Sequence, residues 1–378
     1  MVQDIIVVGG GVIGSSIAYR LAQAGAKVTI VERGRIGCES SRAGAGMLAP
    51  QSEARSPGPF FDLCMDSFRL YRDFASELSE LSGIDVEYRD EGALHVFFED
   101  EEKRDSEEWT AWQAGAGLAL EALTREDLAA LEPAIRRENI GGVFLASEHQ
   151  IENRKMMEAL AVALKRAGVR VVEGEDVREI LVEGERAVGV DCDSGRLGAG
   201  TIVVASGSWS SSLLARAGVD ISIVPARGQM VAVKGREAPI RHVVHSRDCY
   251  LVPRLDGRIL IGATVEYEGF EKRNTPKGVA SLLLSGMGLV PDLESFEVVE
   301  MWSGLRPDTP DHLPVLGPAG LANLLLATGH FRNGLLLAPK TAELISRYVI
   351  DGSSAAEMEP FSLSRFAVDR NIESLARP

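Results

Sequence analysis

The first 32 residues combine a strand, a glycine-rich turn, a helix and a second strand, and this order constrains the fold more than any other feature. The apolar run at 4–8 is typical of a strand buried on both faces of a parallel sheet. It leads into Gly-Gly-Gly-Val-Ile-Gly at 9–14, and apolar residues then recur at helical spacing up to Gly25. A second strand at 28–31 ends at Glu32. The sequence therefore predicts a βαβ unit and an α/β fold with a Rossmann-like domain.

Each glycine of this turn has a role in holding a dinucleotide. Gly9 allows the tight turn, Gly11 lets the backbone approach a pyrophosphate, and Gly14 lets the helix pack on the strand. The helix N-terminus offers unpaired N–H groups to the phosphates. Glu32 would accept hydrogen bonds from both ribose hydroxyls, and its charge disfavours a ribose 2′-phosphate. The fingerprint fits NAD and FAD equally, and a glycine-rich connector in another α/β fold is the alternative.

The residues that follow Glu32 favour FAD. An NAD-dependent dehydrogenase would continue with further strands and helices, whereas residues 33–47 form a long loop of small residues. Such a loop lets the backbone lie close to a flat, extended ligand. Ser40, Ser41 and Arg42 offer hydroxyl and cationic contacts to phosphate. A plain flexible loop is the alternative.

The rest of the chain predicts two kinds of architecture. Helices are predicted over 60–81, 99–116, 126–132, 153–168, 210–217 and 335–349. Strands are predicted over 92–98, 169–172, 177–180, 200–207 and 325–328. Between 219 and 301 the pattern changes to alternating strands, at 229–233, 250–253 and 258–263, with a hairpin turn at 255–257. This part predicts a second domain built on a large mixed or antiparallel sheet.

At 378 residues the chain is long enough for about two or three domains. We expect a discontinuous FAD-binding domain made of residues 1–82, 148–218 and 302–365. Residues 83–147 and 219–301 are expected to form the substrate-binding domain, and residues 366–378 a C-terminal tail.

Composition excludes several classes of protein. The 55 acidic and 40 basic residues give a formal net charge of −15, which repels nucleic acid and anionic lipid. Cys38, Cys64, Cys192 and Cys249 lie far apart without a CxxC pair, so neither a disulfide framework nor a thiolate metal site is predicted. Residues 1–4 carry no basic region, and no apolar stretch approaches the roughly 20 residues of a spanning helix. We expect a cytoplasmic protein.

Several motifs together resemble a known family. They are the turn at 9–14, the small-residue loop ending at 45–47, Cys-Tyr-Leu-Val-Pro-Arg at 249–254, Gly-Leu-Arg-Pro at 304–307 and Gly-His-Phe-Arg-Asn-Gly at 329–334. This set resembles the FAD-dependent amine and D-amino-acid oxidases, and most closely the glycine oxidases of the thiazole branch of thiamine biosynthesis. The resemblance implies a non-covalent FAD, a substrate domain on a large sheet and often a homotetramer.

The resemblance also implies roles for individual residues. Arg306 matches the arginine that holds a substrate carboxylate, Tyr250 the tyrosine beside it, and Arg332 a further contact. The expected cofactor contacts are Gly9, Gly11, Val12, Ile13, Gly14, Glu32, Arg33, Ser40, Ser41, Arg42, Ala45, Gly46, Met47, Val177, Gly207, Trp209, His330, Phe331, Arg332, Asn333, Gly334, Leu335 and Leu336. An ion pair for Arg306 and core packing for Tyr250 are the alternatives, and His330 is expected to be a structural hydrogen-bonding residue.

The implied reaction is oxidative deamination of glycine, sarcosine or small D-amino acids, with hydride transfer to FAD and molecular oxygen as the final acceptor. No catalytic side chain and no metal site are predicted, because the cofactor supplies the chemistry. One alternative is an FAD-dependent D-amino-acid dehydrogenase that passes electrons to another carrier. A second alternative is a non-enzymatic module that binds a dinucleotide as a structural or sensing ligand.

Overall fold

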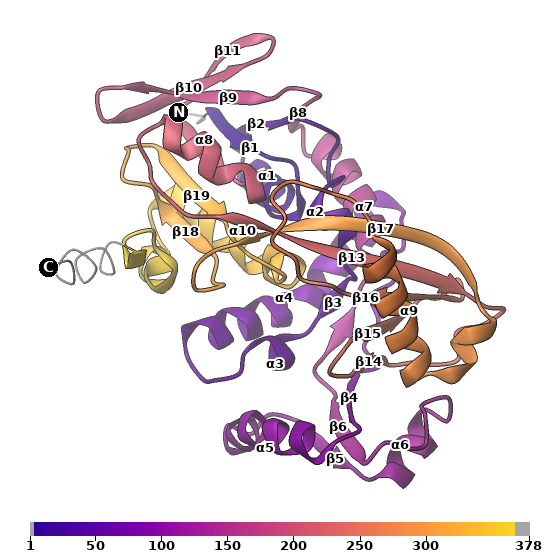
Figure 1. Ribbon diagram of the computed structural model, residues 1–378. Helices are drawn as coiled ribbons and strands as arrows, with labels where there is room; N and C mark the ends of the chain where they lie inside the picture. Colours follow the sequence, from indigo (N-terminus) through magenta and orange to yellow (C-terminus); the bar gives the residue numbers. More distant parts are fainter. Residues whose placement is uncertain (1–3, 367–378) are drawn as a thin grey trace, which may run out of the picture.

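The computed structural model describes residues 4–366, and a six-stranded sheet lies at its centre (Figure 1). The strand order is β18-β19-β12-β1-β2-β8, and every pairing is parallel except that of β18 with β19. The strands are β1 (Asp4–Val8), β2 (Lys27–Glu32), β8 (Arg170–Glu173), β12 (Thr201–Val204), β18 (Val315–Pro318) and β19 (Leu324–Thr328). This arrangement confirms the predicted α/β class.

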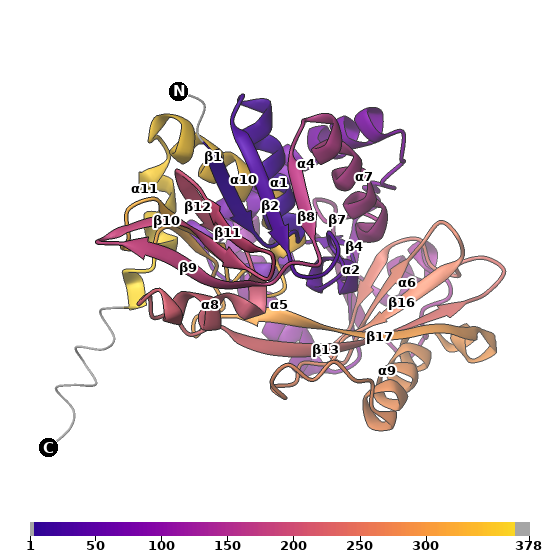
Figure 2. The ribbon, with the colours of Figure 1, turned by 90° about the horizontal axis from the view of Figure 1, so that it is seen from above.

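Both faces of this sheet are covered (Figure 2). One face packs against α1 (Val12–Gln23), α4 (Pro59–Ser82), α7 (Asn153–Arg166) and α10 (Gly334–Asp351). The other face packs against α8 (Ser210–Arg216) and a small sheet of β9 (Val177–Glu183), β10 (Arg186–Cys192) and β11 (Gly195–Gly198). Side chains of β1 alternate between the two cores, Ile5 and Val7 in the first and Ile6 and Val8 in the second. This alternation explains the continuous apolar run of β1.

A second, eight-stranded sheet stands beside the first (Figure 1). In spatial order its strands are β17 (Glu297–Asp308), β13 (Val224–Lys234), β16 (Arg258–Gly262), β15 (Tyr250–Pro253), β14 (Val243–His245), β4 (Ala93–Phe97), β6 (Gly141–Leu145) and β5 (Glu121–Leu123). Only β14 and β4 pair in parallel, so the predicted mixed sheet is confirmed. One face packs on α6 (Arg125–Leu131) and α9 (Pro276–Leu289), and α5 (Asp100–Gly115) lies near β4 and β6.

Short elements join the two sheets. The small-residue loop contains α2 (Ser40–Ala43) and β3 (Met47–Leu48), and α3 (Pro50–Glu53) follows at once. Strand β3 pairs with β7 (His149–Gln150). The remaining helix, α11 (Ala355–Met358), packs beside β18. Among residues 4–366, no helix combines the length and the apolar content needed to cross a bilayer.

Sequence reasoning missed several elements of the second half. Helix α9 interrupts the region that was expected to contain strands only, and Thr275 caps it by accepting a hydrogen bond from the Gly278 N–H. Strands β10, β11 and β17 were also missed. The predicted hairpin is confirmed, because β15 and β16 pair antiparallel around residues 255–257.

The proposed division into domains stays a prediction. Strand β17 crosses the expected boundary between residues 301 and 302 and pairs with β13 on both sides of it. The predicted C-terminal tail lies outside the described residues, apart from residue 366.

A glycine substitution tests how tightly α1 packs on β1. A Cβ at Gly14 would lie 2.0 Å from the Gly9 carbonyl oxygen and 3.2 Å from the Ala205 Cβ. We expect Gly14→Ala to lower the free energy of unfolding of the apoprotein by about 1–3 kcal/mol, measured by thermal or urea unfolding.

Gly115→Ala is the matched control, since a Cβ there meets no atom within 4 Å. Its stability should stay equal or rise slightly, because alanine favours a helix more than glycine does. An unchanged midpoint for Gly14→Ala would contradict the close packing of helix on strand.

Candidate active site

A cavity of about 700 Å³ lies where the two sheets meet. One wall is formed at the carboxyl ends of β1, β2, β12 and β19, the edge at which ligands bind in open α/β sheets. The other wall comes from the eight-stranded sheet and includes His95, Met230, Tyr250, Gly262 and Arg306. The cavity therefore brings together motifs from both ends of the chain.

Nearly all of the predicted site residues line this one cavity. The exceptions are Gly14, which packs α1 against β1, and Arg42, which does not face the cavity. The lining residues that were predicted are Gly9, Gly11, Val12, Ile13, Glu32, Arg33, Ser40, Ser41, Ala45, Gly46, Met47, Val177, Gly207, Trp209, Tyr250, Arg306, His330, Phe331, Arg332, Asn333, Gly334, Leu335 and Leu336.

The turn between β1 and α1 leaves a helix N-terminus open to the cavity. Gly9 has a φ of +103°, a conformation that favours glycine, and a Cβ there would meet the Ala205 carbonyl oxygen at 2.5 Å. Helix α1 has no side-chain cap at Gly11 and no acidic residue in its first turn. The Val12 N–H donates to the Ser41 hydroxyl at 2.8 Å, which brings the small-residue loop to this helix end. Free N–H groups and the helix dipole suit an anion at this position.

The acid at the end of β2 is buried and held in place. One carboxylate oxygen of Glu32 accepts the Gly10 N–H at 2.7 Å, and the other accepts the Gly34 N–H at 2.8 Å. A carboxylate has about four acceptor positions, so two remain for other donors. Next to it the Arg33 guanidinium stacks on the Trp209 ring, 3.5 Å from the ring centre. This end of the cavity combines an acceptor with a flat cationic surface.

Contacts with Arg254 and Ile151, which are outside the predicted set, hold the small-residue loop. Gly46 has a φ of +75°, and a Cβ there would lie 1.9 Å from the Ile151 carbonyl oxygen. The buried Arg254 donates to the Ala45 carbonyl at 2.7 Å and to the Ile151 carbonyl at 3.0 Å. Its guanidinium lies 3.2 Å from the Glu152 carboxylate, and burial lowers the pKa of Arg254 to about 10. The loop is therefore anchored to the eight-stranded sheet, which sequence reasoning did not foresee.

Cationic and phenolic groups gather at the end of the cavity formed by the eight-stranded sheet. Arg306 donates to the Thr264 carbonyl at 3.1 Å and crosses Gly228, where a Cβ would lie 2.4 Å from the guanidinium. The Tyr250 hydroxyl lies 3.3 Å from the Met230 sulfur, and burial raises the pKa of Tyr250 although Arg306 opposes that shift. These groups can receive a small anion.

Arg332 is the outermost of these groups. It donates to the Glu53 carboxylate at 2.8 Å, and about half of its side chain is exposed.

The turn at 329–334 directly follows β19 and lines the cavity. His330 is buried and shares a hydrogen bond of 3.1 Å with the Thr341 hydroxyl. Burial lowers the pKa of His330 to about 3, so the imidazole is neutral at physiological pH. Asn333 begins helix α10, whose first turn lines the cavity and contains no acidic residue. A second helix N-terminus therefore points at the same space.

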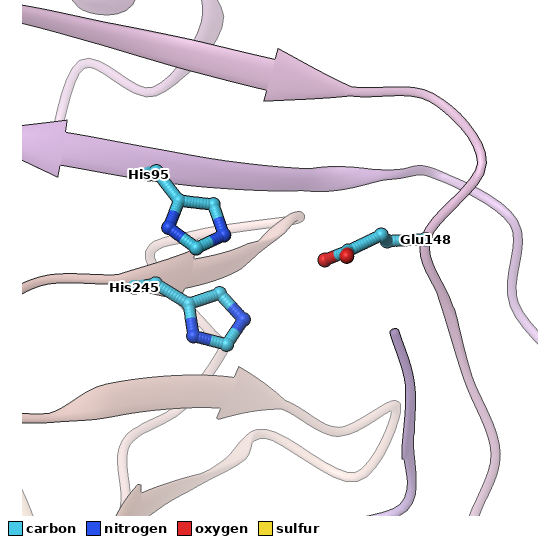
Figure 3. Close-up of side chains that lie close together, drawn as sticks. All are labelled: His95, Glu148 and His245. Carbon is cyan, nitrogen blue, oxygen red and sulfur yellow. The ribbon is translucent and has the colours of Figure 1, made fainter. Parts of the chain in front are cut away.

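A polar cluster beside the cavity was also missed, and Figure 3 shows three of its side chains, His95, Glu148 and His245, of which Glu148 is buried. It consists of Ser52, His95, Glu148 and His245, and we call it the His–Glu cluster. No local pattern links these four positions, because they come from four separate segments of the chain.

Comparisons with known proteins agree with this geometry. The family model described as FAD dependent oxidoreductase matches residues 4–348. The glycine oxidase of Geobacillus kaustophilus is 36% identical over 366 residues, which cover 96% of this chain and 97% of that protein. The bifunctional protein ThiO/ThiG of Synechocystis is 36% identical over 375 residues, or 97% of this chain. The chain spans 55% of that relative's length.

The fold agrees as closely as the sequence. The crystal structure of glycine oxidase from Geobacillus kaustophilus superposes with a TM-score of 0.93 at 35% identity, over 96% of this chain and 99% of that one. These matches confirm the resemblance that the motifs indicated. The chain therefore belongs to the family of FAD-dependent oxidoreductases, and its cofactor is FAD.

Proposed function

We propose that this enzyme oxidatively deaminates glycine and related small amines such as sarcosine and small D-amino acids. The products are an oxo acid, ammonia or an amine, and hydrogen peroxide. The observation that carries the proposal is the position of Arg306 and Tyr250, which share one cavity with the small-residue loop at 45–47. The glycine oxidase named above supports it, since its similarity to this chain extends over nearly the full length of both proteins.

We propose one orientation for FAD in the cavity. We assign the adenosine to Glu32, Arg33 and Val177, and the pyrophosphate to the N-terminus of α1 with Ser40 and Ser41. The flavin ring is assigned to the space between 45–47 and 330–336. In support, all of these segments line the one cavity.

When bound, FAD supplies a two-electron acceptor that takes a hydride from the carbon bearing the amine. The protein's own part is to hold that carbon and keep it oriented. Arg306 presents two N–H groups in one plane to a carboxylate, an arrangement that lysine cannot offer. Its charge-assisted hydrogen bonds each contribute about 1.5–3 kcal/mol. Water then hydrolyses the imino acid to the oxo acid.

The pocket also favours the reactive form of the amine. Burial lowers the pKa of His245 to about 4 and of His330 to about 3, so neither ring competes as a cation at neutral pH. The same desolvation disfavours a substrate ammonium and so favours the neutral amine that donates the hydride.

We further propose a cytoplasmic homo-oligomer, a homotetramer, with non-covalent FAD and molecular oxygen as acceptor. The four cysteines are free, and three are buried, which agrees with a reducing compartment. Service to thiamine biosynthesis is proposed from the relatives named ThiO/ThiG, of which this chain matches only a part.

A ribose test addresses the cofactor. Glu32→Ala removes the buried acceptor of two N–H groups and the proposed ribose contact. We expect flavin affinity of the apoprotein to fall at least tenfold, or about 1.4 kcal/mol, in a fluorescence-quenching titration.

Glu183→Ala, an exposed acid on β9, serves as the control and should bind flavin like the wild type. Equal flavin affinity for wild type and Glu32→Ala would remove Glu32 from the ribose site.

A carboxylate test addresses the substrate. Arg306→Leu should retain the yellow cofactor but raise KM for glycine at least tenfold, about 1.4 kcal/mol, because the planar guanidinium is lost. The exposed Arg236→Leu on the same domain is the control and should keep the wild-type KM. The measurement is steady-state kinetics under air. An unchanged KM for glycine in Arg306→Leu would exclude the proposed contact of Arg306 with the substrate carboxylate.

An oxygen test separates oxidase from dehydrogenase. Glycine added without oxygen should bleach the flavin, and glycine added under air should produce peroxide in equal amount to the substrate consumed. Bleaching without oxygen uptake would favour transfer to another carrier, and absence of bleaching by glycine, sarcosine and small D-amino acids would overturn the proposed function.

A further inference from the structure

The His–Glu cluster lies at the substrate end of the cavity but has no part in the reaction described so far. Ser52, His95 and His245 line the cavity, whereas Glu148 lies behind them and is 1% exposed. The cluster is close to the proposed carboxylate site, because the His245 ring lies 6.1 Å from the Tyr250 ring. The cluster therefore adjoins the place where we propose that the substrate carboxylate binds.

Strand pairing brings the two imidazoles together. His95 on β4 and His245 on β14 are direct partners in the parallel register, and their rings stack with centres 4.5 Å apart and planes 5° apart. Ser52 ties Glu148 to this stack. Its N–H donates to one Glu148 oxygen at 2.6 Å, and its hydroxyl lies 2.6 Å from the His95 Nε2.

Two atoms of the cluster have no partner. The second carboxyl oxygen of Glu148 and the Nε2 of His245 are both buried and unpaired among the described residues. Figure 3 shows the Glu148 carboxyl group pointing toward the two rings, while the second nitrogen of each ring points away from it. A buried unpaired polar atom costs about 1–3 kcal/mol, so this pair is poised to share a proton through one bridging water.

The charges around the cluster favour a proton on the carboxyl group. Burial raises the pKa of Glu148 to about 7, with Glu53 adding to the rise and the Ser52 N–H opposing it. Burial and, to a smaller extent, the nearby charge of Arg332 lower the pKa of His245 to about 4. Burial, His245 and Arg55 lower the pKa of His95. Tyr250 is the remaining titratable group against the stack.

A metal ion fits this geometry poorly. An imidazole nitrogen directs its lone pair in the ring plane, and two parallel planes do not meet at a common ion. The Nε2 of His95 is also engaged by the Ser52 hydroxyl. One ring would have to rotate before His95, Glu148 and His245 could bind the same ion.

We propose that His245 and Glu148 form a proton relay that removes the proton released from the substrate ammonium. In this step an N–H bond of the ammonium breaks and its proton moves to the Nδ1 of His245. The proton on Nε2 moves to the Glu148 carboxylate, which becomes a neutral acid. The substrate carbon gives its hydride to the flavin, the oxidant, and the substrate becomes an iminium. This inference rests on the proposed function and adds to it residues that carry the proton.

The decisive experiment compares the wild type with Glu148→Gln across pH 5.5–9. Flavin bleaching by glycine is followed without oxygen by stopped flow. The wild-type rate should rise with pH through about 7, because the relay needs an ionised Glu148. In Glu148→Gln the bleaching rate should no longer rise with pH through about 7, and at pH 8 it should be at least tenfold lower than in the wild type. The variant keeps the shape of the site, since the glutamine amide oxygen can still accept from the Ser52 N–H.

Glu91→Gln is the matched control, a largely buried carboxylate with an unpaired oxygen that does not line the cavity. It should keep the wild-type pH profile. An identical profile in Glu148→Gln would overturn the relay.

A second readout requires no turnover. The folded pKa of Glu148 lies above the ordinary value of 4.5, so ionisation weakens the fold as pH rises from about 4.5 to 7. The difference in Tm between the Glu148→Gln apoprotein and the wild-type apoprotein should therefore be larger at pH 8 than at pH 5, by at least about 3 °C in favour of the variant. An infrared titration of the apoprotein should show a protonated carboxyl band that disappears with a midpoint near pH 7 and is missing in Glu148→Gln.

The two readouts separate the two proposals. A wild type that oxidises no small amine would defeat the proposed function and with it the relay, even if Glu148 titrates near pH 7. Normal oxidation together with a Glu148 that is fully ionised at pH 5.5 would defeat the relay alone. One zinc or iron ion per purified chain that is lost in Glu148→Gln would also overturn it in favour of a metal site.

Discussion

The burial of β1 on both faces is the constraint on which the rest of the structure depends. Ile5 and Val7 enter one core while Ile6 and Val8 enter the other, so the strand is fixed at the centre of the sheet. The chain must then leave it by a tight turn, and Gly9 has a positive φ and no room for a Cβ, which would lie 2.5 Å from the Ala205 carbonyl oxygen. The helix that follows points its N-terminus at the carboxyl edge of the sheet. The location of the cofactor is a consequence of packing at this strand.

The second requirement is a fixed distance between the two sheets, and a buried ion pair supplies it. Arg254 extends from the eight-stranded sheet to the carbonyl groups of Ala45 and Ile151, with Glu152 as its counter-ion. A guanidinium buried without these partners would be strongly unfavourable. The Trp302 N–H donates to the Ala43 carbonyl at 2.9 Å and holds the same loop from β17. Small side chains in the loop therefore serve two purposes, close backbone approach to the cofactor space and close contact with the sheet.

The sequence predicts motifs that are continuous in the chain, and it misses sites whose residues come from distant segments. The β1–α1–β2 unit and the turn at 329–334 are continuous motifs, so their residues could be expected to meet at one cavity. Arg42 could not be separated from Ser40 and Ser41 by pattern, because its direction depends on the four-residue helix α2. Helix α9 escaped notice since its glycines and apolar residues give no clear helical stripe. The His–Glu cluster was out of reach, because the register between β4 and β14 alone brings His95 to His245.

The electrostatic design of the cavity follows from these elements. The chain has a net charge of −15, yet the cavity receives the N-termini of α1 and α10, neither of which has an acid in its first turn. Their dipoles lie on the side where we propose the pyrophosphate and the flavin, the parts of the cofactor that carry or receive negative charge. At the other end Arg306 has no carboxylate partner among residues 4–366, whereas Arg332 is paired with Glu53. The proposed site for the substrate carboxylate therefore lies at Arg306, and the neutral histidines beside it leave the adjoining amine of the proposed substrate free to lose its proton.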